Sequence, residues 1–164
     1  MSPRVPLDAA DLRILAALQK DGTLSIASLS ESVHLSHNSC WRRLKRLEAA
    51  GIIKGRVALL DPAKVGLALT AYVSIRTSEH NDTWLAAFTR AVESLPEIVE
   101  LYRMTGDVDY LLKIRVANME AYDAVYKKLI RMVKLTDVSS GFAMEELKNT
   151  TELPLRTVCA AGGE

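Results

Sequence analysis

The chain has 164 residues and a formal net charge of +1, and 49% of its residues are hydrophobic and 25% charged. These values are typical of a globular protein with one domain or two small ones, and they exclude a protein that is basic over its whole surface. No apolar run approaches the roughly 20 residues of a membrane span, and the start, MSPRVPLDAADL, has no apolar stretch of signal-peptide type. We therefore expect a cytoplasmic protein without a membrane partner.

The titratable side chains do not indicate a metal site or a redox site. Cys40 and Cys159 are far apart and lack metal-ligand spacing, so we expect reduced thiols. His34, His37 and His80 share no ligand spacing with Asp, Glu or Cys. The sequence therefore predicts no metal and no cofactor.

The first predicted helix follows Asp8, which is a suitable N-cap, and ends near Asp21-Gly22. Its buried stripe consists of Leu12, Leu15 and Leu18. Two short helices joined by a tight turn are predicted next. Ser25 and Ser36 are placed as their N-caps, and Gly51 is placed to end the second. The spacing predicts that the following apolar side chains are buried: Ile26, Leu29, Val33, Cys40, Leu44 and Leu47.

The opposite side of the helix after Ser36 is cationic. The basic run 42–46, with Lys54 and Arg56 beyond it, is opposed locally only by Glu48. A helix with an apolar back and a cationic front suits the major groove of DNA, although an ordinary solvated helix face is the alternative. Trp41 flanks the buried side and is expected to pack there. The predicted contacts to double-stranded DNA are Ser36, His37, Asn38, Ser39, Arg42, Lys45, Arg46 and Arg56.

Residues 52–53 and 57–60 are interpreted as two short strands around Lys54-Gly55-Arg56, which makes a winged arrangement. Residues 61–68 contain Pro62 and Gly66 and are predicted to be a linker. We therefore expect a winged helix-turn-helix domain over residues 7–60.

Past the linker, the pattern predicts a second domain over residues 69–148 and a tail over 149–164. Alternating apolar residues indicate strands at 69–76, 98–105, 109–116 and 138–147. Helical spacing indicates one helix around residues 84–95 and another from Asn118 to Val133. The order βαββαβ predicts a ferredoxin-like arrangement, and the whole chain is of the α+β class.

A turn containing Gly106 connects the second and third of these strands. Its backbone N–H groups are free to meet a carboxylate, and Asp107 or Asp109 is able to pair with an ammonium group. Every free amino acid carries both of these charges. A plain hairpin turn is the alternative interpretation. The candidate segment consists of Thr105, Gly106, Asp107, Val108, Asp109 and Tyr110.

These residues together resemble the Lrp/AsnC (feast/famine) family of bacterial and archaeal transcription regulators. The resemblance covers about residues 7 to 150, and four segments carry it: LDAADLRILAALQKDG, LSHNSCWRRLKRLEAAGIIKGRVALLDP, MTGDVDYLLKIRV and FAMEELK. It implies a winged helix-turn-helix and a RAM/ACT-like ligand-sensing domain that dimerises through its sheet. It further implies homodimers that assemble into tetramers or octamers.

The resemblance also implies an amino acid or related metabolite as effector, bound in a cleft between neighbouring dimers. The CWRRLKRLE and SSGFAMEELKNTTELPL segments resemble a subgroup whose effectors include sulfur amino acids such as cysteine. Matching positions extend the effector candidates to Arg103, Met104, Met119, Gly141, Phe142 and Ala143. Much of the family carries a bulkier Tyr-Val-Val at 141–143, so the identity of the effector does not carry over.

Other classes of protein are less consistent with the sequence. No nucleophile elbow, Walker loop or dinucleotide glycine pattern indicates an enzyme. The strand 109–116 offers aliphatic residues where an RNA-recognition motif needs stacking aromatics. An architectural protein that compacts DNA without a ligand is the main alternative. We expect a regulator whose effector shifts its assembly and so alters DNA affinity, DNA bending or contact with RNA polymerase.

Overall fold

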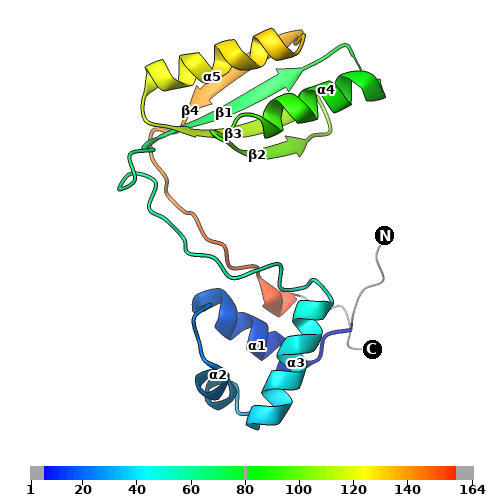
Figure 1. Cartoon of the computed structure of the whole chain (residues 1–164), viewed down its shortest axis with the longest axis vertical. Coiled ribbons are helices and arrows are strands. Elements are labelled where there is room, and N and C mark those ends of the chain that lie inside the picture. Colours follow the sequence, from blue (N-terminus) through cyan, green and yellow to red (C-terminus); the bar gives the residue numbers. More distant parts are fainter. Residues whose placement is uncertain (1–5, 80, 158–164) are drawn as a thin grey trace. The chain divides into compact units, whose positions relative to one another are not determined.

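The computed structural model describes residues 6–79 and 81–157, and the chain forms two compact units (Figure 1). The first unit comprises Met1–Ala58 and Lys148–Glu164, and the second comprises Leu59–Leu147. Of the helices in the described residues, none is long and apolar enough to cross a membrane. Cys159 and His80 lie outside the described residues.

Three helices build the first unit, and all three predicted N-caps are confirmed. They are α1 (Ala9–Lys20), α2 (Ile26–Ser32) and α3 (His37–Ala49). The side chain of Asp8 accepts the Asp11 N–H at 2.9 Å, in a capping box that Asp11 completes. Ser25 and Ser36 cap α2 and α3 in the same way. Gly51 ends α3 with φ of +68°, a conformation that favours glycine.

The three helices enclose a small core of their own. Its buried members are Ile14, Leu15, Leu29, Val33, Cys40, Leu44 and Leu47, and all of them except Ile14 were expected from helical spacing. Leu18 and Ile26, also expected to be buried, are only partly buried and pack against this core. Burial raises the pKa of the Cys40 thiol, as an apolar environment disfavours the thiolate. Cys40 is therefore a packing residue.

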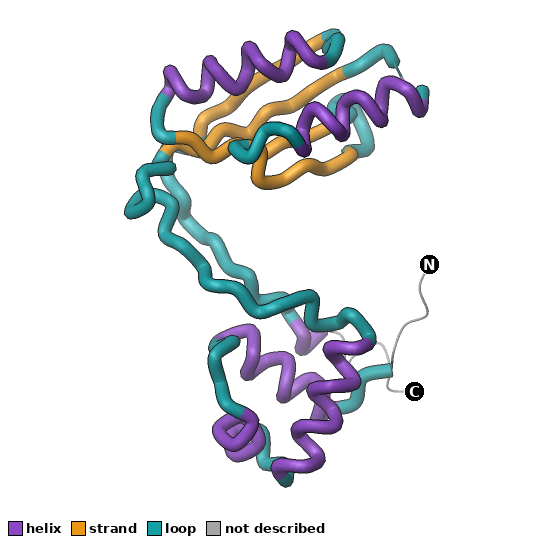
Figure 2. The backbone as a smooth tube through the Cα atoms, viewed as in Figure 1, coloured by secondary structure: helices purple, strands orange, loops and turns teal. Residues whose placement is uncertain are grey.

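The two strands predicted at 52–53 and 57–60 are wrong. No strand occurs among the described residues of the first unit, as Figure 2 shows. The N–H groups of Ile52 and Ile53 donate to the Leu47 carbonyl at 3.1 and 3.4 Å, and both side chains pack on the helical core. This pair therefore completes the end of α3, and residues 57–60 have no strand to pair with.

The tail after the second unit returns to the first. The side chain of Gln19 accepts the Leu153 N–H at 2.6 Å and donates to the Leu153 carbonyl at 3.3 Å. Leu155, in a short 3₁₀ helix (Leu155–Thr157), packs on the first unit's core. Local sequence patterns do not predict this association, because it joins residues more than 130 positions apart.

The second unit is a four-stranded antiparallel sheet in the order β2-β3-β1-β4. Its elements are β1 (Leu69–Arg76), α4 (Asp82–Glu93), β2 (Ile98–Arg103), β3 (Tyr110–Val116), α5 (Met119–Met132) and β4 (Asp137–Phe142). This is the predicted βαββαβ order. β4 ends earlier than the predicted Leu147, because beyond Phe142 only Ala143 still donates to β1, at the Thr70 carbonyl.

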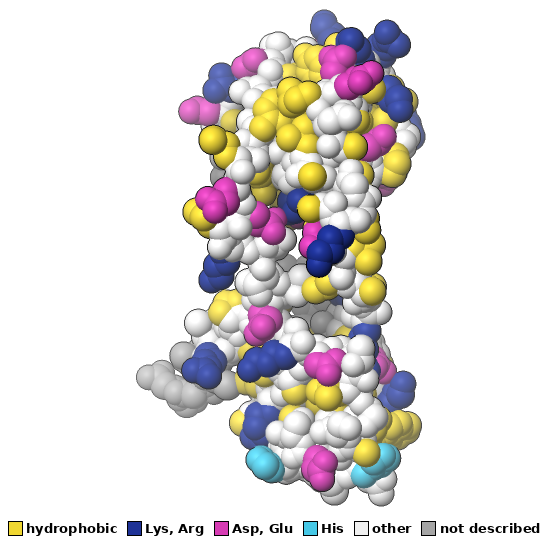
Figure 3. Space-filling view, turned by 90° about the vertical axis from the view of Figure 1, so that its left-hand side faces the viewer, with side chains coloured by type: hydrophobic (Ala, Val, Ile, Leu, Met, Phe, Trp, Pro, Cys, Tyr) yellow, Lys and Arg dark blue, Asp and Glu magenta, His cyan; other side chains and the backbone are white. Residues whose placement is uncertain are grey.

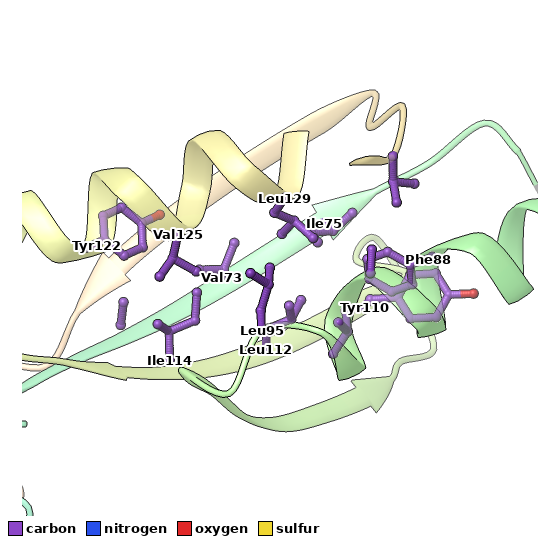
Figure 4. Packing of buried hydrophobic residues seen from close by; sticks show 14 of the residues in the cluster. Val73, Ile75, Phe88, Leu95, Tyr110, Leu112, Ile114, Tyr122, Val125 and Leu129 are labelled. Carbon is purple, nitrogen blue, oxygen red and sulfur yellow. The ribbon is translucent and has the colours of Figure 1, made fainter. Parts of the chain in front are cut away.

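Both helices cover the same face of this sheet (Figure 1). Figure 4 shows inward-facing side chains of β1 and β3, such as Val73, Ile75 and Leu112, meeting Leu129 of α5. Phe88 of α4 is fully buried. The sheet and its two helices therefore form a core separate from that of the first unit.

Neither described helix of the second unit covers the other face of the sheet (Figure 1). Tyr72 of β1 is 43% exposed there and Tyr102 of β2 is 52% exposed. Between their strands, the Lys113 ammonium lies 3.0 Å from the Glu100 carboxylate and lowers the pKa of Glu100. This open face of the sheet is amphipathic, because it carries the rings of Tyr72 and Tyr102 together with the Lys113–Glu100 ion pair.

Candidate DNA-binding and effector sites

The candidate DNA-binding face is the outer side of α3. His37, Asn38, Arg42 and Lys45 are exposed, and Cys40, Leu44 and Leu47 hold the opposite side in the core. Arg42 forms no ion pair with a described residue. Figure 3 shows Lys and Arg side chains next to carboxylates on one face of this unit, the unit with the cyan histidines. Some basic side chains of this unit are therefore paired with carboxylates, and others are not.

Two of these cations are engaged by α1. Arg43 lies 2.6 Å from Asp8 and 2.9 Å from Asp11, and Arg46 pairs with the other oxygen of Asp11. Asp11 is fully buried, so its charge depends on these partners. The expectation that only Glu48 opposes the basic run is therefore wrong, because α1 supplies two more carboxylates through space. The Arg46 side chain nevertheless remains 47% exposed.

The same contacts lower the pKa of Asp8 to about 2, chiefly through the Asp11 N–H and then through Arg43. Since this value lies below the ordinary 3.8, Asp8 stabilises the folded first unit above about pH 4. That stabilisation is lost as the pH falls through about 2. We expect Asp8→Ala to lower the midpoint of thermal unfolding at pH 7, and the difference from the unaltered chain to shrink between pH 4 and pH 2.

Circular dichroism melts across this pH range measure the effect. Asp82→Ala is a suitable control, because Asp82 also lies in the first turn of a helix but is not the N-cap. A difference for Asp8→Ala that stays constant down to pH 2 would contradict the assignment of this stabilisation to the Asp8 carboxylate.

Arg56 and Lys45 share one carboxylate. Lys45 lies 3.0 Å from Glu48 and Arg56 lies 3.4 Å from it, and Arg56 also reaches the Gly22 carbonyl at 3.5 Å. Both side chains remain at the surface. Arg56, predicted as a DNA contact on a wing, thus lies on an irregular segment that its ion pair with Glu48 helps to hold against α3.

Trp41 is not packed as expected, because 51% of its surface is exposed. Sequence reasoning placed it at the edge of the apolar stripe of α3, and no segment of the described first unit covers it. Its neighbours are the candidate contacts on α3 and the segment 53–56. Trp41 is therefore a surface residue of the candidate DNA-binding face that the sequence analysis missed.

The candidate effector turn is exposed at the end of β2. Gly106 has φ of +100°, and the N–H groups of Thr105, Gly106 and Asp107 donate to no described residue. Asp107 is exposed, whereas Asp109 is half-buried and accepts the Thr77 N–H at 2.8 Å. Asp109 thus fastens the turn to the end of β1, and Asp107 is the carboxylate that remains available to a ligand.

Arg103 and Met104 lie beside this turn, at the end of β2, whereas the other effector candidates lie at the opposite end of the sheet. Phe142 pairs in register with Ala71 near the start of β1, and its ring meets Tyr122 of α5 edge-on with centroids 5.0 Å apart. The Tyr122 hydroxyl is hydrogen-bonded to Ser140. Met119, at the start of α5, is 55% exposed, and Gly141 leaves open space where a Cβ would stand. These residues form a second cluster: Met119, Gly141, Phe142 and Ala143.

One chain does not bring the two clusters together. Arg103 pairs with Tyr110, and Tyr110 with Ile75, so the turn is level with Val138 at the start of β4. Phe142 lies four residues further along β4, while three strand spacings separate β2 from β4. Strand geometry puts the clusters about 20 Å apart. No free amino acid spans that distance.

Family models match nearly the whole described chain. A model described as the Lrp/AsnC ligand binding domain matches residues 70–153, and a winged helix-turn-helix DNA-binding model matches residues 7–54. With the observed sheet topology, these matches confirm the predicted fold class: a winged helix-turn-helix followed by a ferredoxin-like sensing domain.

Characterised relatives are similar over most of their length. The glutamate uptake regulatory protein of Zymomonas mobilis is 55% identical over 149 residues, which is 91% of each chain. The DNA-binding transcriptional activator DecR of Escherichia coli is 50% identical over 150 residues, 91% of this chain and 99% of the relative. Both are regulators rather than enzymes, in agreement with the prediction of a non-enzyme.

A solved structure has a similar fold and a ligand. It is a transcriptional regulator of Neisseria meningitidis in complex with L-methionine, and it is 37% identical to this chain. The likeness covers 93% of this chain and 99% of that one, with a TM-score of 0.88.

Proposed function

Because the chain belongs to the Lrp/AsnC family of DNA-binding transcriptional regulators, we propose that a small amino acid controls its binding to specific DNA sites. The observation that carries this proposal is the pairing, in one chain, of a cationic helix-turn-helix with an exposed turn rich in free N–H groups. The protein is proposed to act in the cytoplasm, where its DNA target lies. Its effect on transcription would then follow from where it binds relative to RNA polymerase.

The proposed contacts with DNA centre on Asn38, Arg42 and Lys45, which are exposed along α3. Arg42 is the strongest candidate for reading a base, because it has no ion pair with a described residue to release first and its guanidinium matches a guanine edge. Lys45 and Arg56 would have to exchange Glu48 for phosphate. Ser36, His37, Ser39 and Arg46 complete the proposed interface.

The proposed effector site is shared between copies of the chain. The turn would bind an amino acid carboxylate through its N–H groups, and Asp107 would pair with the ammonium group. The second cluster, around Met119 and Phe142, would supply apolar contacts to the side chain from a neighbouring copy. The flexible thioether of Met119 and the open space at Gly141 suit a sulfur amino acid as effector. This proposal agrees with the L-methionine bound by the relative from Neisseria meningitidis.

Assembly is part of the proposal, since a site that needs two copies exists only in the oligomer. The open face of the sheet, with Tyr72 and Tyr102 exposed, is the surface proposed to form the dimer. Higher assembly into tetramers or octamers would then bring a turn of one dimer to the second cluster of another. An effector that favours one assembly state shifts the population toward it and so changes DNA binding.

A thermal-shift panel of the full chain against the common amino acids tests the proposal. An effector at about 100 times its Kd adds roughly 2.7 kcal/mol to the stability of the folded state. We expect a clear rise of the unfolding midpoint with at least one amino acid, methionine and cysteine included. We expect Asp107→Asn to reduce this rise strongly, whereas Asp123→Asn, an exposed aspartate of α5 outside both clusters, leaves it unchanged.

The same ligand should change the oligomer size in light scattering and the affinity for an enriched DNA duplex. DNA binding with little sequence preference and no response to any amino acid would instead support an architectural protein. No binding of duplex DNA would overturn the proposal altogether.

A further inference from the structure

Trp41 is a large apolar side chain that stands on the outer face of α3 with 51% of its surface exposed. An indole normally dominates a core or an interface, because it buries more apolar area than almost any other side chain. Here it forms the wall between two hollows. One is lined by Ser36, Asn38, Ser39 and Arg42, and the other is a groove of about 630 Å³ toward the segment 53–56.

The groove has an apolar floor and a cationic rim. Ile26, Leu44 and Ile53 line its floor beside Trp41. Around it stand three cations, Lys45, Lys54 and Arg56, and one carboxylate, Glu48, which already pairs with two of them. The excess of positive charge fits a polyanion and disfavours a cationic partner.

A DNA major groove combines this excess of negative charge with one kind of apolar projection. Phosphates line its edges, and the C5-methyl groups of thymines are the apolar groups on its floor. Trp41 lies one helical turn from Asn38 and Lys45. It would therefore enter the major groove of the DNA together with them when α3 docks there. Leu44 and Ile53 flank the indole of Trp41, and these apolar surroundings favour an apolar contact with the DNA over a hydrogen bond.

We propose that Trp41 is a specificity-determining residue that reads a thymine methyl group in each half-site, beside the base read by Arg42. The inference rests on the proposed binding of specific DNA, and it adds an apolar position to a site otherwise made of polar and charged side chains. The groove toward residues 53–56 accommodates the methyl and the adjoining edge of the base, while Lys54 and Arg56 meet the flanking phosphates.

Replacement of thymine by deoxyuridine tests this contact, because it removes the methyl group and keeps the base pairing. A duplex is first enriched from a random pool with the purified full chain, and each thymine is then replaced in turn. We expect one position per half-site at which the replacement weakens binding about fourfold, the worth of one buried methyl-sized group. We expect no such loss at that position for Trp41→Ala.

Variants separate this contact from a general loss of affinity. Lys54→Ala, on the rim of the same groove, should weaken binding to the thymine and deoxyuridine duplexes by the same factor. Trp41→Phe should keep part of the preference for thymine. Equal sensitivity of the unaltered chain and Trp41→Ala at every thymine would overturn the inference, even if Trp41→Ala binds more weakly overall.

Fluorescence of the unaltered chain gives a second measurement that needs no variant at Trp41. The other tryptophan, Trp84, is only 9% exposed, so acrylamide quenches mainly Trp41. We expect the enriched duplex to protect Trp41 from quenching, and unchanged quenching would overturn the inference. A pool that yields no preferred duplex would overturn the proposed function itself, whereas a preferred duplex without a Trp41-dependent thymine overturns the inference alone.

Discussion

Joint replacement of Arg42 and Lys45 by alanine is expected to weaken binding to the enriched duplex by roughly 30-fold or more. An arginine on a guanine edge is worth about 1–3 kcal/mol, and the proposed dimer would present it to two half-sites. Loss of Lys45 from both copies removes two phosphate contacts, so the slope of log affinity against log salt should become shallower by about 2. Fluorescence anisotropy of a labelled duplex at several salt concentrations measures both quantities.

Two single substitutions provide the controls. Arg43 is adjacent to Arg42 in the chain but pairs with Asp8 and Asp11, so Arg43→Ala should lower thermal stability more than affinity. Lys20→Ala removes an exposed cation from the last turn of α1 and should change neither strongly. If Arg43→Ala weakened binding as much as Arg42→Ala at unchanged stability, the assignment of inward and outward cations on α3 would be wrong.

Phe88→Ala is expected to destabilise the second unit by about 3–5 kcal/mol, the usual cost of removing a fully buried phenyl ring. Phe88 is 0% exposed and forms a cluster of three rings with Trp84 and Tyr110, whose ring centroids lie 5.0 and 4.9 Å from its own. Since the first unit has its own core, we expect its unfolding midpoint to stay in place while that of the second unit falls by more than about 10 °C. The response to effector should disappear at temperatures where the second unit has unfolded.

The two tryptophans report the units separately, because Trp84 belongs to the second core and Trp41 to the surface of the first unit. Leu85→Ala, on the same helix but only partly buried, should cost clearly less than Phe88→Ala. Equal shifts of both probes with Phe88→Ala would contradict independent unfolding of the units.

Features that depend on neighbouring residues were predictable from the sequence. The alternation in β1 gave Leu69–Arg76 with both bounds correct, because a half-buried strand has a period of two. Asp8, Ser25 and Ser36 were predictable as N-caps, because a short polar side chain before a helix is placed to accept the N–H three residues ahead, and each of the three does so. The βαββαβ order followed from these local patterns.

Features that depend on distant residues were not predictable in this way. Ile52 and Ile53 have the composition of a strand, yet they close the end of α3 because no partner strand is adjacent. Asp11 lies in the first turn of α1, where the local sequence gives no reason to expect a partner on another helix, yet its pairing with Arg43 and Arg46 joins α1 to α3. The separation of the effector candidates into two clusters is likewise a property of strand register, which composition does not show.

The return of residues 148–157 to the first unit makes the DNA-binding domain discontinuous, with the sensing domain inserted into it. On the ribosome, α1, α2 and α3 emerge before the entire sensing domain, and the segment that bonds to Gln19 emerges after it. The DNA-binding domain therefore attains its final packing only once the sensor has been synthesised. A chain cut short within the sensor lacks the Leu153 and Leu155 contacts, so incomplete copies are deprived of a finished DNA-binding domain as well as of a sensor.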